Sequence, residues 1–200
     1  MERSPDPNPP SPSVLRSGAV RTNGGASKYK VEESTLMTAK SNFTPDEWKV
    51  LLQSMIAAGI AITAAEPHGL WGLLKESFAS GTELAKVKTD PKANALIKTV
   101  VDDFNTAEGS AARDALKAKF KDSKPAQIKD KCMETLREAA AIVDAKAPGD
   151  STAYKGWLQQ ISQHVAEASK EGGFLGVGGV LVSEAEKATL TEISTALKAA

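Results

Sequence analysis

Apolar residues recur at helical spacing between turn signals in this chain, and this pattern constrains the fold more than any other feature. The stretch after Asp90-Pro91 is a clear case, with large apolar residues three and four positions apart: Leu96, Ile97, Val100, Val101 and Phe104. Such spacing places side chains on one face of a helix. The alternation typical of a strand reaches no useful length outside Val180-Leu181-Val182. We therefore expect an all-α protein.

Capping and breaking residues divide this pattern into a single bundle of about seven helices. Thr44-Pro45-Asp46-Glu47 supplies a threonine cap, a proline at the first helical position and a glutamate three residues after the cap. Ser183-Glu184-Ala185-Glu186 forms a second capping box. The expected helices cover residues 45–65, 70–80, 91–105, 110–121, 125–146, 152–170 and 184–197. The first has almost no polar face, so we expect it at the centre.

Residues 1–42 differ in composition from the rest of the chain. They are rich in Pro, Ser, Gly and Asn, carry few large apolar side chains and show no periodicity, so burial cannot offset the entropy lost on ordering. We predict a disordered, removable N-terminal tail, followed by one helical domain over residues 43–200. The tail acts as a spacer or carries a short docking motif such as Tyr29–Met37.

Charge and cysteine content exclude several function classes. Lys plus Arg equals Asp plus Glu at 25 each, so no global field attracts nucleic acid or an acidic membrane. Cys132 is the single cysteine, which excludes an internal disulfide or a multi-cysteine metal site. The opening residues lack the features of a secretion signal, and Val50–Ala65 is too short and weakly apolar to span a bilayer. We expect a cytoplasmic protein without a cofactor.

One local charge excess is present. Seven basic residues stand against three acidic ones between Arg113 and Lys131. The common explanation for such an excess is a solvated basic face. The functional explanation is a site that binds phosphate or an acidic partner. The candidate anion-binding residues are Lys117, Lys121 and Lys124.

The segment 172–180 carries five glycines among apolar residues. It is not a dinucleotide loop, because Leu181 stands where the last glycine of the motif belongs and a helix precedes it. Three interpretations stay open: a connection packed over the core, a docking surface for a protein partner, or a loop that touches a membrane. The candidate partner-binding residues are Phe174, Leu175, Val177 and Val180.

No residue pattern predicts a catalytic or metal site. His68 lies in a Pro-Gly turn and His164 near an apolar stripe, and neither has the paired spacing of zinc or di-iron ligands. Cys132 falls on an apolar helix face, where a thiol behaves as a small hydrophobe. Asp102-Asp103 point apart on a helix and are interpreted as its solvated end. The three tryptophans lie among core-spaced residues: Trp48, Trp71 and Trp157.

The sequence Val182-Ser183-Glu184-Ala185-Glu186, followed by Leu190 and Ile193, resembles a helix start in the tellurite-resistance TerB-like helical family. The resemblance covers about residues 165–197. It implies a helical fold and a stress-related setting. The preceding loop lacks the aspartates of the family and has only Glu171 nearby, so no metal ligand is carried over from the resemblance.

Three function hypotheses follow from these patterns. The leading one is a non-enzymatic helical module that binds a protein partner or a second copy of itself. The second is an enzyme or metal protein whose sparse acids meet a histidine only in the fold: Glu66, Glu171 and Asp102 with His68 or His164. The third is peripheral membrane association through the Gly-rich segment and the basic residues.

Overall fold

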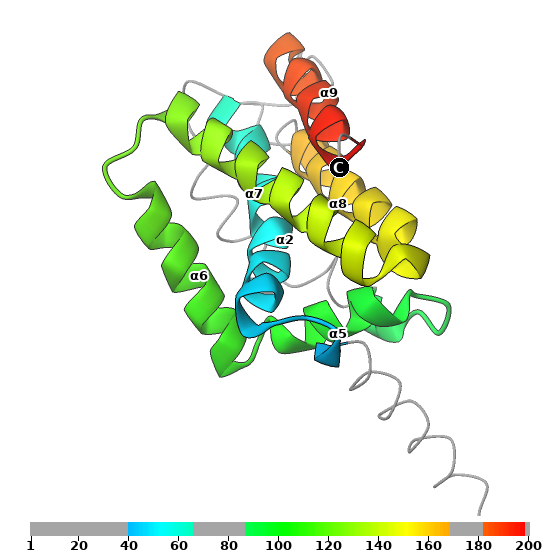
Figure 1. The fold of residues 1–200 in the computed structure, drawn as a ribbon. Coiled ribbons are helices and arrows are strands. Elements are labelled where there is room, and N and C mark those ends of the chain that lie inside the picture. Colours follow the sequence, from blue (N-terminus) through cyan, green and yellow to red (C-terminus); the bar gives the residue numbers. More distant parts are fainter. Residues whose placement is uncertain (1–39, 66–86, 169–181, 199–200) are drawn as a thin grey trace, which may run out of the picture.

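The computed structural model describes residues 40–65, 87–168 and 182–198, which form helices joined by turns (Figure 1). The helices of these ranges are α2 (Pro45–Ala65), α5 (Ala95–Asp103), α6 (Ala107–Phe120), α7 (Pro125–Lys146), α8 (Pro148–Ala168) and α9 (Glu184–Lys198). None of the described residues is in a strand. The all-α prediction is confirmed. The helix expected over residues 70–80 lies outside the described residues, as do Trp71 and His68.

Helix α2 runs through the middle of the bundle and packs against each of the other five helices named above for the described ranges (Figure 1). Its large side chains Leu51, Leu52 and Met55 are fully buried. The small residues Ala57 and Ala61 are buried as well, which allows neighbouring helices to approach closely. The predicted central position of this helix is confirmed.

Helices α7 and α8 pack on α2 and on each other. The inward face of α7 is buried at Cys132, Leu136, Ala139 and Val143. Helix α8 starts at Pro148 and not at the expected Thr152, because a proline fits the first turn of a helix, where no partner for its missing N–H is needed. A single residue therefore separates α7 from α8.

Helix α5 begins four residues later than expected. Asp90 accepts a hydrogen bond from the backbone N–H of Lys92 (2.8 Å) and closes a turn. The cap is Asn94, whose side chain accepts from the N–H of Ile97 at 3.2 Å. Helix α6 begins at Ala107, three residues before the expected Ser110.

Both predicted capping boxes form. Thr44 donates its N–H to the Glu47 carboxylate (2.7 Å), and the Thr44 hydroxyl accepts from the N–H of Glu47 (3.2 Å). The same reciprocal pair joins Ser183 and Glu186 at 2.8 and 3.1 Å. The hydrogen bond from the Thr44 N–H holds the pKa of the Glu47 carboxyl below its usual range.

Buried polar contacts link α2 to α6 and α8, among them a hydrogen bond from the Tyr154 hydroxyl to the carbonyl of Leu51 (3.0 Å). The Gln53 amide donates to the carbonyl of Ala112 (3.2 Å). The hydroxyls of Ser54 and Tyr154 are 3.0 Å apart, and Ser162 donates to the carbonyl of Ala58 (2.9 Å). Among the described residues, no buried side-chain nitrogen or oxygen is left without a partner.

Candidate functional site

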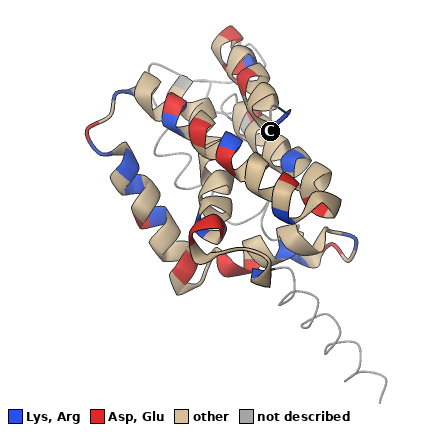
Figure 2. Ribbon diagram, viewed as in Figure 1, with Lys and Arg blue, Asp and Glu red and all other residues tan. Residues whose placement is uncertain are grey.

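The predicted anion-binding residues lie together where α6 ends and α7 begins. Lys117 is on the last turn of α6, Lys121 directly follows the helix and Lys124 directly precedes α7. All three are exposed, and no described residue forms an ion pair or hydrogen bond with their ammonium groups. We call these three lysines the basic corner; Figure 2 shows the run of basic residues to which they belong.

The other four basic residues of this segment are engaged within the protein. Lys119 pairs with Glu134 (3.1 Å) and Lys129 with Glu192 (2.9 Å). Lys131 donates to the carbonyl of Lys119 (2.7 Å), where a positive charge stabilises the C-terminal end of α6. The guanidinium of Arg113 hydrogen-bonds the carbonyl of Phe104 and lies 4.6 Å from the centre of its ring.

Backbone geometry holds the basic corner in a tight turn. Asp122 has a positive φ of 58°, a conformation that aspartate tolerates better than most side chains. The N–H of Lys124 donates to the side chain of Gln127 at 2.8 Å, which satisfies one group at the start of α7. The corner is therefore a defined turn that presents its lysines to solvent.

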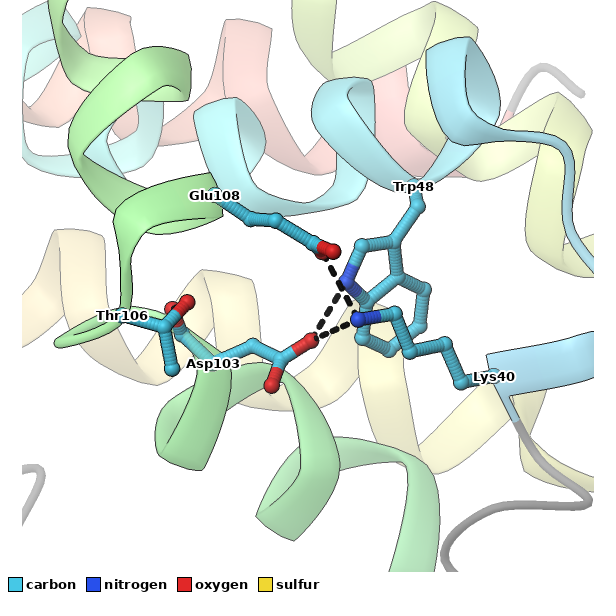
Figure 3. Close-up of polar contacts among 5 residues, drawn as sticks. All are labelled: Lys40, Trp48, Asp103, Thr106 and Glu108. Carbon is cyan, nitrogen blue, oxygen red and sulfur yellow. Dashed lines mark hydrogen bonds and ion pairs between the residues drawn. The ribbon is translucent and has the colours of Figure 1, made fainter.

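A second polar cluster lies where α2, α5 and α6 meet (Figure 3). The ammonium group of Lys40 contacts the carboxylates of Asp103 (2.5 Å) and Glu108 (2.7 Å), and it lies 5.5 Å from the centre of the Trp48 ring. The indole N–H of Trp48 donates to the same Asp103 oxygen at 2.9 Å. We call these four residues the clasp.

The clasp corrects two predictions. Lys40 falls within the tail of residues 1–42 that we predict to be disordered, yet it binds residues of three helices. Asp103 was interpreted as part of a solvated helix end, yet only 20% of its side chain is exposed. Asp102 does lie on the exposed side, where it pairs with Lys88 at 3.0 Å.

One sequence signal pointed to the clasp. Phe43 directly precedes the Thr44 cap and Trp48 stands four residues after the cap, which is the spacing of a hydrophobic staple. Their ring centres lie 5.6 Å apart. The chain is therefore already packed on the domain before α2 begins.

Burial alone would lower the pKa of the Lys40 ammonium group. The hydrogen bonds to Asp103 and Glu108 and the negative charges of these two carboxylates together outweigh burial, and the pKa is raised. Lys40 is thus held in its charged form, as an ion-pair partner and not as a base.

Two candidate nucleophiles, Cys132 and Ser151, are respectively buried and engaged in a hydrogen bond. Burial raises the pKa of the Cys132 thiol to about 12, so it carries almost no thiolate near neutral pH. Ser151 donates to Asp144, which also accepts from Lys155 at 2.8 Å through both oxygens. Hydrogen bonds from Lys155 and Ser151 lower the pKa of Asp144, so its carboxylate is a poor base for the serine proton.

Within the described ranges, the structure gives little support to a site built from histidine or to a metal site. His164 is exposed on α8, and no three His, Cys, Asp or Glu side chains of the described residues gather as metal ligands do. Glu66 and Glu171 lie outside these residues. The Gly-rich segment with Phe174, Leu175, Val177 and Val180 lies outside them too.

Within the three described ranges, every helix is too short or too polar to cross a lipid bilayer. No protein-family model, curated protein or solved structure matches this chain.

Proposed function

We propose that this protein is a non-enzymatic helical interaction module, and that its basic corner binds an acidic segment of a protein partner. The observation that carries the proposal is that the basic residues between Arg113 and Lys131 fall into two groups, those with a partner inside the protein and those without a described one. Four of them serve the fold, whereas Lys117, Lys121 and Lys124 are exposed and have no described partner. A carboxylate-rich partner supplies the negative charges with which these lysines can pair.

The surrounding chemistry supports binding over catalysis. The described thiol is buried and protonated, and Ser151 donates to an aspartate that is paired with Lys155. The stress-related setting rests on the resemblance of residues 165–197 to the TerB-like family. The Gly-rich segment stays a predicted second contact surface.

A charge-matched comparison tests the proposal. One variant replaces Lys117, Lys121 and Lys124 by Gln, and the control replaces Lys92, Arg137 and Lys198 by Gln. The control residues are also exposed, and no described residue pairs with their side chains. Both variants lose the same net charge. Fluorescence anisotropy with a labelled glutamate-rich peptide at low salt measures the affinity.

We expect the corner variant to bind the peptide about tenfold more weakly, because three exposed pairs contribute roughly 0.5 kcal/mol each. The control should change affinity less than about twofold. Equal losses in both variants would mean that only net charge matters, and the corner would not be a site. Binding to phosphatidylserine vesicles without binding to the peptide would replace the proposal with peripheral membrane association.

A further inference from the structure

The clasp contains a binding site that its own lysine fills. Two carboxylates from different helices, Asp103 at the end of α5 and Glu108 at the start of α6, both contact the ammonium group of Lys40. The face of an aromatic ring, Trp48, lies 5.5 Å from the same nitrogen. Charge-assisted hydrogen bonds together with an aromatic face are how proteins recognise ammonium groups. We call Trp48, Asp103 and Glu108 the notch.

Contacts that do not involve Lys40 hold the notch in place. The Trp48 indole N–H binds Asp103 at 2.9 Å, and the Trp48 ring packs against Phe43. The backbone carbonyl of Asp103 accepts from the N–H and the hydroxyl of Thr106 at 3.0 and 2.6 Å. These bonds fix the end of α5 without help from Lys40. Trp48 and Asp103 are therefore held in place by contacts other than those with Lys40.

The notch also opens to solvent. The side chain of Lys40 is 37% exposed and that of Glu108 is 57% exposed, so an ammonium group from solution can reach the two carboxylates. Without Lys40, these two acids face each other with no described cation between them. Two carboxylates that share one place favour binding of a cation.

We propose that the notch is a binding site for a primary alkylammonium group, filled in cis by Lys40 and open to such a group in trans when Lys40 is absent. The ligand class is that of a lysine side chain. This proposal concerns other residues than the basic corner and stands whether or not the corner binds an acidic partner.

Chemical complementation tests the notch. The full chain with Lys40→Ala is titrated with n-butylammonium chloride, and the indole N–H signal of Trp48 is followed by NMR together with the unfolding midpoint. Sodium chloride and n-butanol at the same concentrations control for salt and for the alkyl chain. The NMR readout does not depend on how much stability the substitution costs.

We expect saturable binding of n-butylammonium to the Lys40→Ala chain, with a dissociation constant on the order of millimolar to tens of millimolar. The midpoint lost in this variant should return on saturation. Adding Glu108→Gln, which changes an exposed side chain, should weaken binding about fivefold or more. Wild-type protein should show no saturable change, since its notch is filled.

Lys88→Ala is the matched control, because Lys88 pairs with a single acid, Asp102 of α5, at 3.0 Å. That variant should gain no more from n-butylammonium than from sodium chloride. The proposal is overturned if the Lys40→Ala chain responds equally to both salts, or if its indole signal does not move. It is also overturned if Glu108→Gln leaves the affinity unchanged.

Discussion

Replacing Gly109 by alanine should strongly destabilise the domain, although the same change usually stabilises a helix. A Cβ at Gly109 would lie 2.1 Å from the carbonyl oxygen of Phe104, 2.5 Å from its carbon and 2.6 Å from the oxygen of Asp103. All three are backbone atoms of the turn between α5 and α6. No side-chain rotation can relieve the overlap, so the turn must move by more than about 1 Å to reach ordinary contact.

The expected magnitude follows from what that movement breaks. The carbonyl of Phe104 accepts from Arg113, and the carbonyl of Asp103 accepts from Thr106, with each such bond contributing about 1 kcal/mol. Overpacking adds about 1–3 kcal/mol, against which the helix propensity of alanine offsets at most about 1 kcal/mol. We expect a net loss of about 2–4 kcal/mol in the free energy of unfolding.

Gly156 is the matched control. It lies in α8, and a Cβ there would meet nothing within 4 Å, so Gly156→Ala should stabilise the protein by up to about 1 kcal/mol. Urea denaturation followed by circular dichroism measures both variants. If Gly109→Ala changes the free energy of unfolding by less than about 0.5 kcal/mol, the turn between α5 and α6 yields freely and this reasoning is wrong.

Four further outcomes are expected. Leu136→Ala should cost about 2–5 kcal/mol in chemical denaturation, because Leu136 is fully buried and its truncation leaves a cavity; a loss under about 0.5 kcal/mol would contradict its place in the core. Hydrogen bonds from Lys155 and Ser151 lower the pKa of Asp144, so this stabilisation is complete above about pH 4, the range of an unfolded aspartate, and is lost as pH falls through the lower folded value. Urea midpoints measured from about pH 2.5 to 6 should fall less steeply with acid in Asp144→Asn. Cys132 should react with an aromatic disulfide reagent only as fast as the protein unfolds, since its thiol is buried; rapid labelling of native protein would show that it is accessible. A chain that starts at Ser41 should have the lower unfolding midpoint of Lys40→Ala, whereas equal midpoints for it and the full chain would show that the clasp adds no stability.

The helices were predictable from the sequence wherever a local signal determined them. The capping boxes at Thr44 and Ser183 fixed two helix starts because cap and partner lie three residues apart in the chain. The bounds of α7 followed from Pro125 and from the breaking residues after Lys146. Two other starts were misplaced because a nearby local signal determined them instead: Asn94 caps α5 after Asp90 closes a turn, and Pro148 fits the first turn of α8.

The basic corner was predictable only in part. Composition reveals the excess of basic residues, but it does not reveal which of them pair with other groups of the protein. Only the structure separates Lys119, which pairs with Glu134, from its neighbours Lys117 and Lys121. The clasp could not be predicted, since its ion pairs join residues more than sixty positions apart. Composition alone placed Lys40 in the tail, although Phe43 already carried the signal of a staple.

The buried polar contacts of α2 with α6 and α8 bear on how uniquely this bundle packs. A helix that is apolar on nearly every side can bury similar areas in several rotations about its axis, and packing alone leaves these arrangements close in energy. Only one rotation lets Gln53 reach α6 while Ser54 meets Tyr154 and the carbonyl of Ala58 meets Ser162. Any other rotation leaves polar groups unpaired in the interior at about 1–3 kcal/mol each. Together these contacts separate one arrangement in energy from its competitors. They therefore contribute more to the conformational specificity of the native state than to its stability.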